Sequence, residues 1–263
     1  IAGKTISTDK VYPGGVAGYS LTGSGITFGE WDGGGVRTTH QEFGGRVLTS
    51  QGSANFHSTH VAGTMIAAGV SPSARGMAYA AQLRAFDWTN DLSEMATEAA
   101  AGLRASNHSY GFITGWDFNY FNDNRWAWFG NPSVSAVEDY RFGFYDQEAQ
   151  DWDAVAHAAP YYLIVKSAGN DRNEGPGSTV QHWVFSGGWT LVTAARNRDG
   201  NSGYDCLSAS SVSKNPLVVG AVEDISGGYS SPSGVVMSSF SAWGPTDDGR
   251  IKPDIVANGV GLT

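Results

Sequence analysis

The sequence predicts an α/β fold of one domain, in which helices flank a mostly parallel central sheet. Two patterns lead to this prediction. Short apolar runs typical of strands alternate along the chain with stretches of helical periodicity, and this alternation indicates parallel strands joined by helices. Residues 161–165 form a nearly continuous apolar run, as expected of a strand that is buried on both faces. We find no internal repeat and no linker that would divide the chain.

The first elements can be assigned in order. Residues 1–23 are polar and rich in glycine, and we interpret them as an N-terminal arm that lies over the domain. A strand is predicted at 26–31, and a strong turn signal, Asp32 followed by three glycines, ends it. Small residues at helical spacing predict a helix over 60–68 that can approach a sheet closely, and a strand follows at 81–86.

The later elements begin at a predicted helix N-terminus. Residues 91–94 match a capping box, with Asp91 as the N-cap and Glu94 three residues further on, so a helix should begin there. Residues 116–145 are unusually dense in aromatic side chains, and we interpret them as an insertion. The other predicted elements are a strand or loop at 105–110, a helix at 146–158, and strands at 161–165, 191–194 and 217–222.

Composition excludes several classes of protein. The 263 residues include 25 acidic and 16 basic side chains, which gives a net charge of −9, and charged residues make up only 16%. A nucleic-acid binder would need a basic surface, and the chain has no apolar run of the ~18 residues that span a membrane. The single cysteine, Cys206, cannot form an internal disulfide. These features fit an exported bacterial enzyme, although they do not identify one.

Polar residues follow three of the predicted strands, at the positions where sites form in parallel sheets. These positions are Asp32, 107–111 and 167–170. Taken alone, Asp32 is most simply a solvated turn residue. His57 and His60, three residues apart, could bind a metal together with Glu42, but they lack the glutamate of the zinc motif His-Glu-x-x-His.

Several blocks of residues, taken in order, resemble the motifs of the subtilisin-like serine proteases, the subtilases. That family has an Asp-Thr/Ser-Gly turn after a strand and a His-Gly-Thr-His-Val-Ala-Gly-Thr segment at a helix start. Asp32-Gly33-Gly34 and residues 57–64 are similar to these two motifs. Residues 107–111 resemble the family's cleft strand, and residues 166–171 resemble its Ala-Ala-Gly-Asn-Glu segment. Further similar blocks lie at 218–222, 238–245 and 248–257.

The resemblance implies a three-layer subtilisin-like fold and a serine endopeptidase that hydrolyses peptide bonds through an Asp-His-Ser triad. Asp32 would orient the imidazole, His57 rather than His60 would be the general base, and Asn170 would donate to the oxyanion. A polypeptide substrate would pair in extended form with two segments of the chain. Those segments are Ser109, Tyr110 and Gly111, and Ser167, Ala168 and Gly169.

Two regions depart from the pattern of the family. Residues 116–145 lengthen the stretch between Gly111 and Ser167, and their aromatic side chains would form either a satellite hydrophobic cluster or an extra wall of the cleft. The loop 69–76 is shorter than in family members that bind calcium there, so we expect no calcium in it. Structural calcium elsewhere is left open without an assigned site, and no metal or other cofactor is expected to take part in catalysis.

The nucleophile of the family lies in a Gly-Thr-Ser-Met-Ala segment, which does not occur in this chain. We therefore expect the triad serine beyond residue 263, on a docked fragment or second chain that completes the fold, and we expect residues 1–263 alone to be inactive. Ser202 lies in a segment that faintly resembles trypsin-like proteases, but those enzymes place His before Asp.

The competing hypothesis is a catalytically inactive subtilase-fold protein that uses the cleft for binding. In either case we expect a secreted, extracellular bacterial protein with polypeptide partners and without nucleic-acid or membrane partners.

Overall fold

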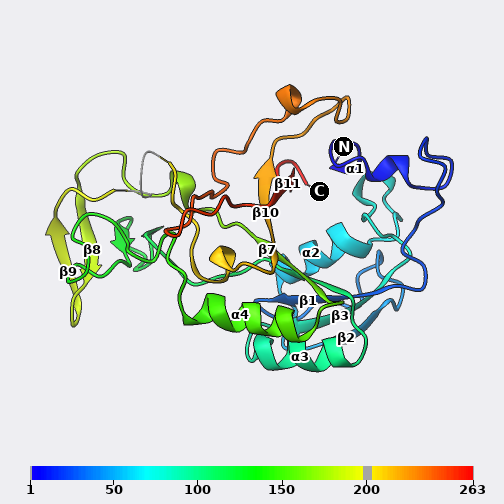
Figure 1. Ribbon diagram of the computed structural model, residues 1–263, viewed down its shortest axis with the longest axis horizontal. Helices are drawn as coiled ribbons and strands as arrows, with labels where there is room; N and C mark the ends of the chain where they lie inside the picture. Colours follow the sequence, from blue (N-terminus) through cyan, green and yellow to red (C-terminus); the bar gives the residue numbers. More distant parts are fainter. Residues whose placement is uncertain (1, 198–202, 263) are drawn as a thin grey trace.

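The structure is a computed structural model that describes residues 2–197 and 203–262 (Figure 1). Seven strands form a central sheet in the order β11-β10-β7-β4-β1-β3-β2, and every pairing within it is parallel. The predicted α/β fold with a mostly parallel central sheet is therefore confirmed. The strands of this sheet are β1 (Thr27–Asp32), β2 (Val47–Ser50), β3 (Gln82–Asp87), β4 (Ala105–His108), β7 (Leu163–Ser167), β10 (Leu217–Val222) and β11 (Ile255–Asn258).

Helices cover both faces of the central sheet, which gives the three layers of the predicted fold. Figure 1 shows α2 (Phe56–Ile66) on one face and α3 (Asp91–Ala100) and α4 (Gln147–Ala158) on the other. Each face has its own core, because alternate residues of a strand point to opposite sides. In β3, Ala85 packs in the core that contains Ala62 and Ile66 of α2. Its neighbour Phe86 packs in the core that contains Met95 of α3 and Trp152 of α4.

The helix that carries His57 begins earlier than the sequence predicts. α2 begins at Phe56 rather than at residue 60, because Asn55 is its N-cap and accepts a hydrogen bond from the backbone N–H of His57 (2.7 Å). Apolar periodicity misses this first turn because Phe56 is 86% exposed. His57 is consequently part of a helix rather than of the preceding loop.

The predicted capping box of α3 is wrong at its first residue. Asn90 is the N-cap, in a left-handed conformation and without a side-chain cap, whereas Asp91 is the first helical residue. Glu94 does not reach back to the cap, since its carboxylate accepts hydrogen bonds from Trp31 Nε1 (3.0 Å) and Gln51 Nε2 (2.7 Å). Tertiary partners have thus replaced the local hydrogen bond that the sequence pattern indicates.

A second, smaller sheet lies apart from the central one, on the left of Figure 1. Its order is β5-β6-β8-β9, and its strands come from two distant parts of the chain. They are β5 (Trp116–Phe118), β6 (Trp126–Trp128), β8 (Gln181–Phe185) and β9 (Trp189–Thr193). The strand predicted at 191–194 therefore exists, but it belongs to this sheet. Trp116 and Trp128 of the aromatic stretch 116–145 pack here, buried against Val184, whereas Phe142 packs in the core that contains Ala168.

Residues 2–23 lie against the rest of the domain through specific hydrogen bonds. Tyr12 donates its hydroxyl to the carbonyl of Met77 (2.8 Å), and Thr5 Oγ1 accepts from the backbone N–H of Ile225 (3.0 Å). The short helix α1 (Ala2–Thr5) contacts β11. The 3-10 helices are η1 (Thr8–Lys10), η2 (Pro72–Ala74), η3 (Asp171–Asn173), η4 (Ala209–Val212) and η5 (Pro232–Gly234).

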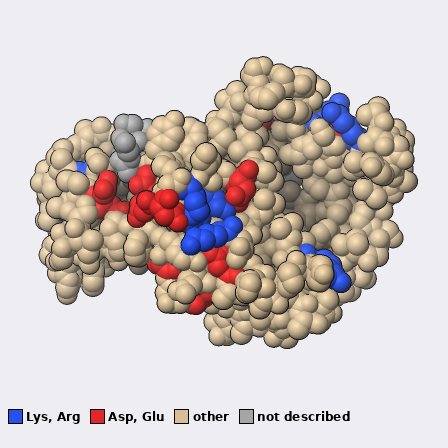
Figure 2. Space-filling model, in the orientation of Figure 1, with Lys and Arg blue, Asp and Glu red and all other residues tan. Residues whose placement is uncertain are grey.

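Charged side chains are unevenly spread over the surface. Figure 2 shows the largest group of them near the middle of the displayed face, acidic and basic side by side, with separate basic groups toward its right edge, while most of that face is uncharged. Such mixed charge is unlike the continuous basic patch of a nucleic-acid-binding surface. None of the helices in the described residues has the length and apolarity needed to cross a membrane.

Glu30 is an unusual residue of β1. It is 0% exposed, and neither of its carboxylate oxygens has a hydrogen-bond partner among the described residues. Burial, together with the negative charge of Asp32 two residues away, raises the pKa of Glu30 well above its usual value. The folded protein therefore holds a proton on Glu30 that the unfolded chain releases above pH ~4.5.

Replacing Glu30 with the isosteric but non-ionising glutamine should make the protein more stable than the wild type above pH ~4.5. The wild type loses stability as the pH rises from the unfolded pKa to the raised folded pKa, at up to ~1.4 kcal/mol per pH unit for one proton. Chemical unfolding of both proteins at several pH values measures this difference. Parallel pH profiles would contradict the assignment of a protonated Glu30.

Candidate active site

The candidate site is a cleft at the carboxyl ends of the central strands. Its volume is about 840 Å³, and it is lined by residues that follow β4 and β7 and by residues of α2. His57 lines it, as do Ser109, Tyr110, Gly111, Ser167, Gly169 and Asn170. Most of the residues singled out from the sequence are therefore brought together by the fold, as expected for the carboxyl edge of a parallel sheet.

Asp32 and His57 form a hydrogen-bonded pair beside this cleft. Asp32 is the last residue of β1 and is 2% exposed, whereas the side chain of His57 is 55% exposed. His57 Nδ1 lies 2.8 Å from Asp32 Oδ1 and 2.9 Å from Oδ2. Because an ionised carboxylate can only accept, Nδ1 must donate, and the neutral imidazole then has its free lone pair on Nε2.

The carboxylate of Asp32 is held by other donors as well. Its Oδ1 accepts from the backbone N–H of Gly33 (2.7 Å) and from the hydroxyl of Ser58 (3.2 Å). These bonds fix the position of the side chain. The hydrogen bond to Asp32, opposed by partial burial, raises the pKa of His57 above its usual value.

Asn55 connects the start of α2 to the turn that follows Asp32. Its Oδ1 caps the helix at His57, its Nδ2 donates to the carbonyl of Gly33 (3.0 Å), and its backbone N–H donates to Gly35 (2.7 Å). Gly34 has a φ of 137°, and a Cβ there would lie 3.0 Å from the carbonyl oxygen of Ser53. Sequence reasoning missed Asn55, although an Asn two residues before a helical His is a recognisable N-cap signal.

Asn170 follows β7 and lines the cleft. It is exposed and is the N-cap of η3, and no hydrogen bond of its side-chain amide occurs within the described residues. The amide is therefore free to donate to a molecule in the cleft. Asp171, which follows it, lines the same cleft, and burial raises the pKa of Asp171 to about 7.

Ala168 differs from the other residues of the two predicted substrate-binding segments. It is 3% exposed and packs in a core with Phe142, Leu207 and Val218 rather than in the cleft. Its backbone N–H donates to the carbonyl of Val219 (2.9 Å). Its side chain therefore anchors the end of β7 in this core.

The residues of the metal alternative do not form a common site. Glu42 is 4% exposed, and its two carboxylate oxygens accept from the backbone N–H groups of Gly69, Val70 and Ser71 at 2.7–2.9 Å. Nδ1 of His57 is bound to Asp32, and His60 stacks on Phe56. Residues 2–197 and 203–262 contain no group of three or more His, Cys, Asp or Glu side chains arranged to hold a metal ion. Ser202 lies outside the described residues.

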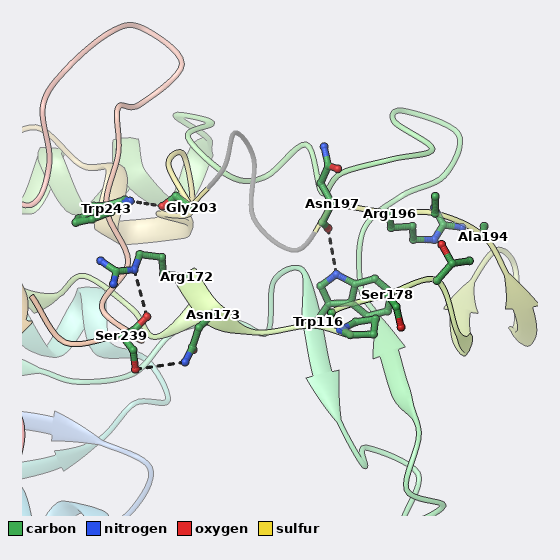
Figure 3. A pocket seen from close by; sticks show the side chains of 14 residues that line it. Trp116, Arg172, Asn173, Ser178, Ala194, Arg196, Asn197, Gly203, Ser239 and Trp243 are labelled. Atoms are coloured by element: carbon green, nitrogen blue, oxygen red, sulfur yellow. Dashed lines mark hydrogen bonds between the residues drawn. The ribbon is translucent and has the colours of Figure 1, made fainter.

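A second cavity, of about 820 Å³, lies between the small sheet and the segments that carry Arg172 and Trp243 (Figure 3). Figure 3 shows Arg172 directed toward Ser239, whose carbonyl accepts from Nε at 3.2 Å, and Trp116 on the opposite side. Arg172 also stacks on Trp243, with 4.0 Å between the guanidinium carbon and the ring centroid. Neither Asp32 nor His57 lines this cavity, so it is not the candidate site.

Comparison with known proteins supports the family suggested by the sequence. The model of the subtilase family matches residues 47–262, a range that includes His57 and Asn170 but not Asp32. The chain belongs to the subtilase family. The resemblance drawn from the sequence motifs is thus confirmed.

Individual relatives are more distant. Serine protease AprX of Bacillus subtilis (strain 168) is 30% identical over 260 residues, covering 93% of this chain and 48% of that protein, so this subtilase chain spans about half the length of its curated relative. Two solved structures share the fold. A lanthipeptide protease has a TM-score of 0.52 at 14% identity, covering 98% of this chain and 60% of its own. The prenylagaramide maturation protease PagA has a TM-score of 0.50 at 19% identity, covering 89% and 63%.

Replacing Asn55 with alanine should reduce the free energy of unfolding by about 0.5–2 kcal/mol, the usual cost of losing an N-cap. It should also loosen His57, because the cap bond is made to the backbone of that residue. Asp146, the N-cap of α4, accepts from Ala149 N–H (3.0 Å) and offers a matched control. D146A should cost similar stability in urea unfolding without broadening the NMR signal of the His57 ring, and equal effects on that ring would contradict this role.

Replacing Asp32 with asparagine should lower the pKa of His57, because the bond that stabilises the imidazolium is lost. NMR titration of the imidazole protons measures it. In the wild type the raised pKa stabilises the folded state below pH ~6.5, and this contribution is lost as the pH rises through the folded pKa of His57. Asp87 ends the neighbouring strand, in register with Asp32, and D87N should leave the titration unchanged. A D32N titration that matches the wild type would refute the pairing.

Proposed function

We propose that this subtilase hydrolyses peptide bonds, with Asp32 and His57 as two members of an Asp-His-Ser triad. The observation that carries the proposal is the hydrogen bond between the buried carboxylate of Asp32 and Nδ1 of His57, at 2.8 Å. A serine hydroxyl is a weak nucleophile until a base accepts its proton, and an imidazole held in this tautomer is such a base. Family membership supports the same conclusion.

His57 would act twice in the reaction. Nε2 first accepts the proton of the serine hydroxyl as that oxygen attacks the carbonyl carbon, and the imidazolium then donates the proton to the departing amine. Asp32 holds the ring in place and stabilises its positive charge without accepting the proton. The raised pKa of His57 is consistent with this stabilisation.

Asn170 would stabilise the negative charge that develops on the carbonyl oxygen. Its amide has no partner within the described residues, lies on the cleft with His57, and can therefore donate to that oxygen. Subtilases use an asparagine for this purpose, and removing one such donor typically costs about 2.7–4 kcal/mol, a value that itself comes from a subtilisin.

The substrate would be an extended polypeptide that adds to the edge segments of the cleft. Ser109, Tyr110 and Gly111 follow β4, Ser167 ends β7 and Gly169 follows it, so the two segments border the cleft from neighbouring strands. Backbone pairing of this kind gives affinity without strong dependence on sequence, and side-chain pockets add the selectivity.

We further propose that the nucleophilic serine lies outside residues 1–263. No hydroxyl group of the described residues is hydrogen-bonded to Nε2 of His57, and the chain contains no Gly-Thr-Ser segment. A segment outside residues 1–263 that docks against the cleft would complete the triad. Secretion is part of the same proposal and is supported by family membership, and recovery of the protein from the culture medium tests it.

Together with the segment that carries the serine, the protein should hydrolyse a denatured polypeptide and react with a fluorophosphonate probe, which labels an activated serine. Mass spectrometry should place the labelled serine outside residues 1–263, and H57A should abolish both reactions. Labelling of an intact protein at a serine within the chain would refute the proposed nucleophile. Peptide binding in the cleft without any serine labelling would favour the inactive binding protein instead.

N170A should lower kcat by about 10²–10³ with little change in KM, because the donor acts mainly in the transition state. Asn173 is the last residue of η3, the short helix that begins after Asn170, but it lines the second cavity, and its amide contacts Ser239 Oγ (3.5 Å). N173A should therefore keep its kcat. If both variants lose the same activity, Asn170 has a structural rather than an electrostatic role.

A further inference from the structure

Lys166 is a buried lysine directly beneath the cleft. It is 2% exposed and lies in β7, one residue before Ser167. Its Nζ donates to the carbonyl oxygen of Tyr110 (2.5 Å) and to the carbonyl (3.3 Å) and hydroxyl (3.2 Å) oxygens of Ser167. The ammonium thus bonds to both of the segments that border the cleft.

The hydrogen bonds of Lys166 lie at the point where the pairing of β4 with β7 ends. β4 and β7 pair in parallel, and their last paired residues are His108 and Lys166. Beyond this point the segments that follow β4 and β7 are no longer paired, and both line the cleft. Within the described residues, the bonds of Lys166 Nζ are the hydrogen bonds that join 109–111 to 167–169. The side chain therefore continues the connection between the strands after their backbone ladder has ended.

Three acceptors require three N–H groups, which an ammonium has and a neutral amine does not. Burial lowers the pKa of Lys166 to about 8, opposed by the charges of Glu148 on α4, Asp171 on η3 and Asp91 on α3. His108 on β4 is held neutral by burial and by Lys166, and the Tyr110 ring lies 5.8 Å from Nζ. The ammonium form, with all three hydrogen bonds, therefore prevails below pH 8 and is lost above it.

We propose that Lys166 is a positioning residue for peptide binding, whose ammonium fixes the spacing of the two cleft segments to which an extended peptide adds. The inference rests on the proposed function, because it concerns the same cleft. It differs from a purely structural role, since no carboxylate lies within ion-pair distance of Nζ among the described residues. A buried ammonium without a carboxylate partner is a costly way to stabilise a fold.

Lys252 provides a matched comparison. It is also buried, at 5% exposure, but its Nζ forms an ion pair with Asp254 (2.7 Å) and reaches the carbonyl of Pro216 (3.4 Å). These partners are outside the cleft. Loss of Lys252 should therefore affect stability, whereas loss of Lys166 should affect peptide binding.

The test uses a peptide chloromethyl ketone, which binds as an extended peptide and alkylates a histidine at the site. His57 Nε2 forms a bond to the methylene carbon, chloride leaves, and the imidazole releases a proton. The rate of labelling, read by mass spectrometry, saturates with probe concentration. The half-saturating concentration reports peptide binding, and the limiting rate reports the reactivity of His57. Labelling should be absent in H57A.

K166M should raise the half-saturating concentration by about tenfold, which corresponds to ~1.4 kcal/mol, while the limiting rate changes little. K252M should leave the half-saturating concentration unchanged. In the wild type this concentration should also rise as the pH passes 8, because Lys166 loses its proton there, and in K166M it should not. The pH series on the wild type tests the inference even if K166M fails to fold.

An unchanged half-saturating concentration in folded K166M, or a wild-type value that is flat across pH 8, would overturn the role of Lys166. Absence of saturable His57 labelling in the wild type would instead count against the proposed function. The two failures are therefore distinguishable.

Discussion

The site depends on how one buried carboxylate is held at the end of a strand. Asp32 is at the carboxyl edge of the central sheet, where its oxygens accept from His57, Ser58 and the backbone of Gly33. An ionised group at 2% exposure is tolerated only when such donors surround it. The glycine turn and the cap at Asn55 bring these donors to it, so that the start of α2, the tautomer of His57 and the shape of the adjacent cleft follow from one constraint.

Much of this arrangement was predictable because it is local in sequence. A strand, a glycine turn and a helix of small residues can be recognised from short windows, and the motif around His57 identified the family. The cleft residues of 109–111 and 167–169 were predictable for the same reason, as each follows a recognisable strand. The caps were less so: Glu94 has the sequence of a capping box, but its carboxylate instead meets Trp31 and Gln51, which no local pattern reveals.

The small sheet could not be predicted as a whole, although a strand at the position of β9 was, because the pairs β5-β6 and β8-β9 come together from distant parts of the chain. β5 and β6 have three residues each, too few for a period, and β6 pairs in parallel with β8, more than fifty residues further along the chain. Their aromatic content indicated a hydrophobic cluster but not its partners. Lys166 is a similar case, since an isolated lysine within an apolar run does not disclose that its amine reaches Tyr110.

The small sheet also connects the two segments that border the cleft. β5 follows the wall formed by 109–111, and β8 follows the wall that ends at Asn170. Parallel pairing of β6 with β8 joins the two paths a second time, in addition to the link made by Lys166. The two segments that border the cleft are therefore connected at two places, and a peptide that pushes the segments apart must strain both connections. Trp116 and Asp117 of β5 themselves line the cleft with His57, so substitutions in the aromatic sheet can alter which backbones the cleft accommodates.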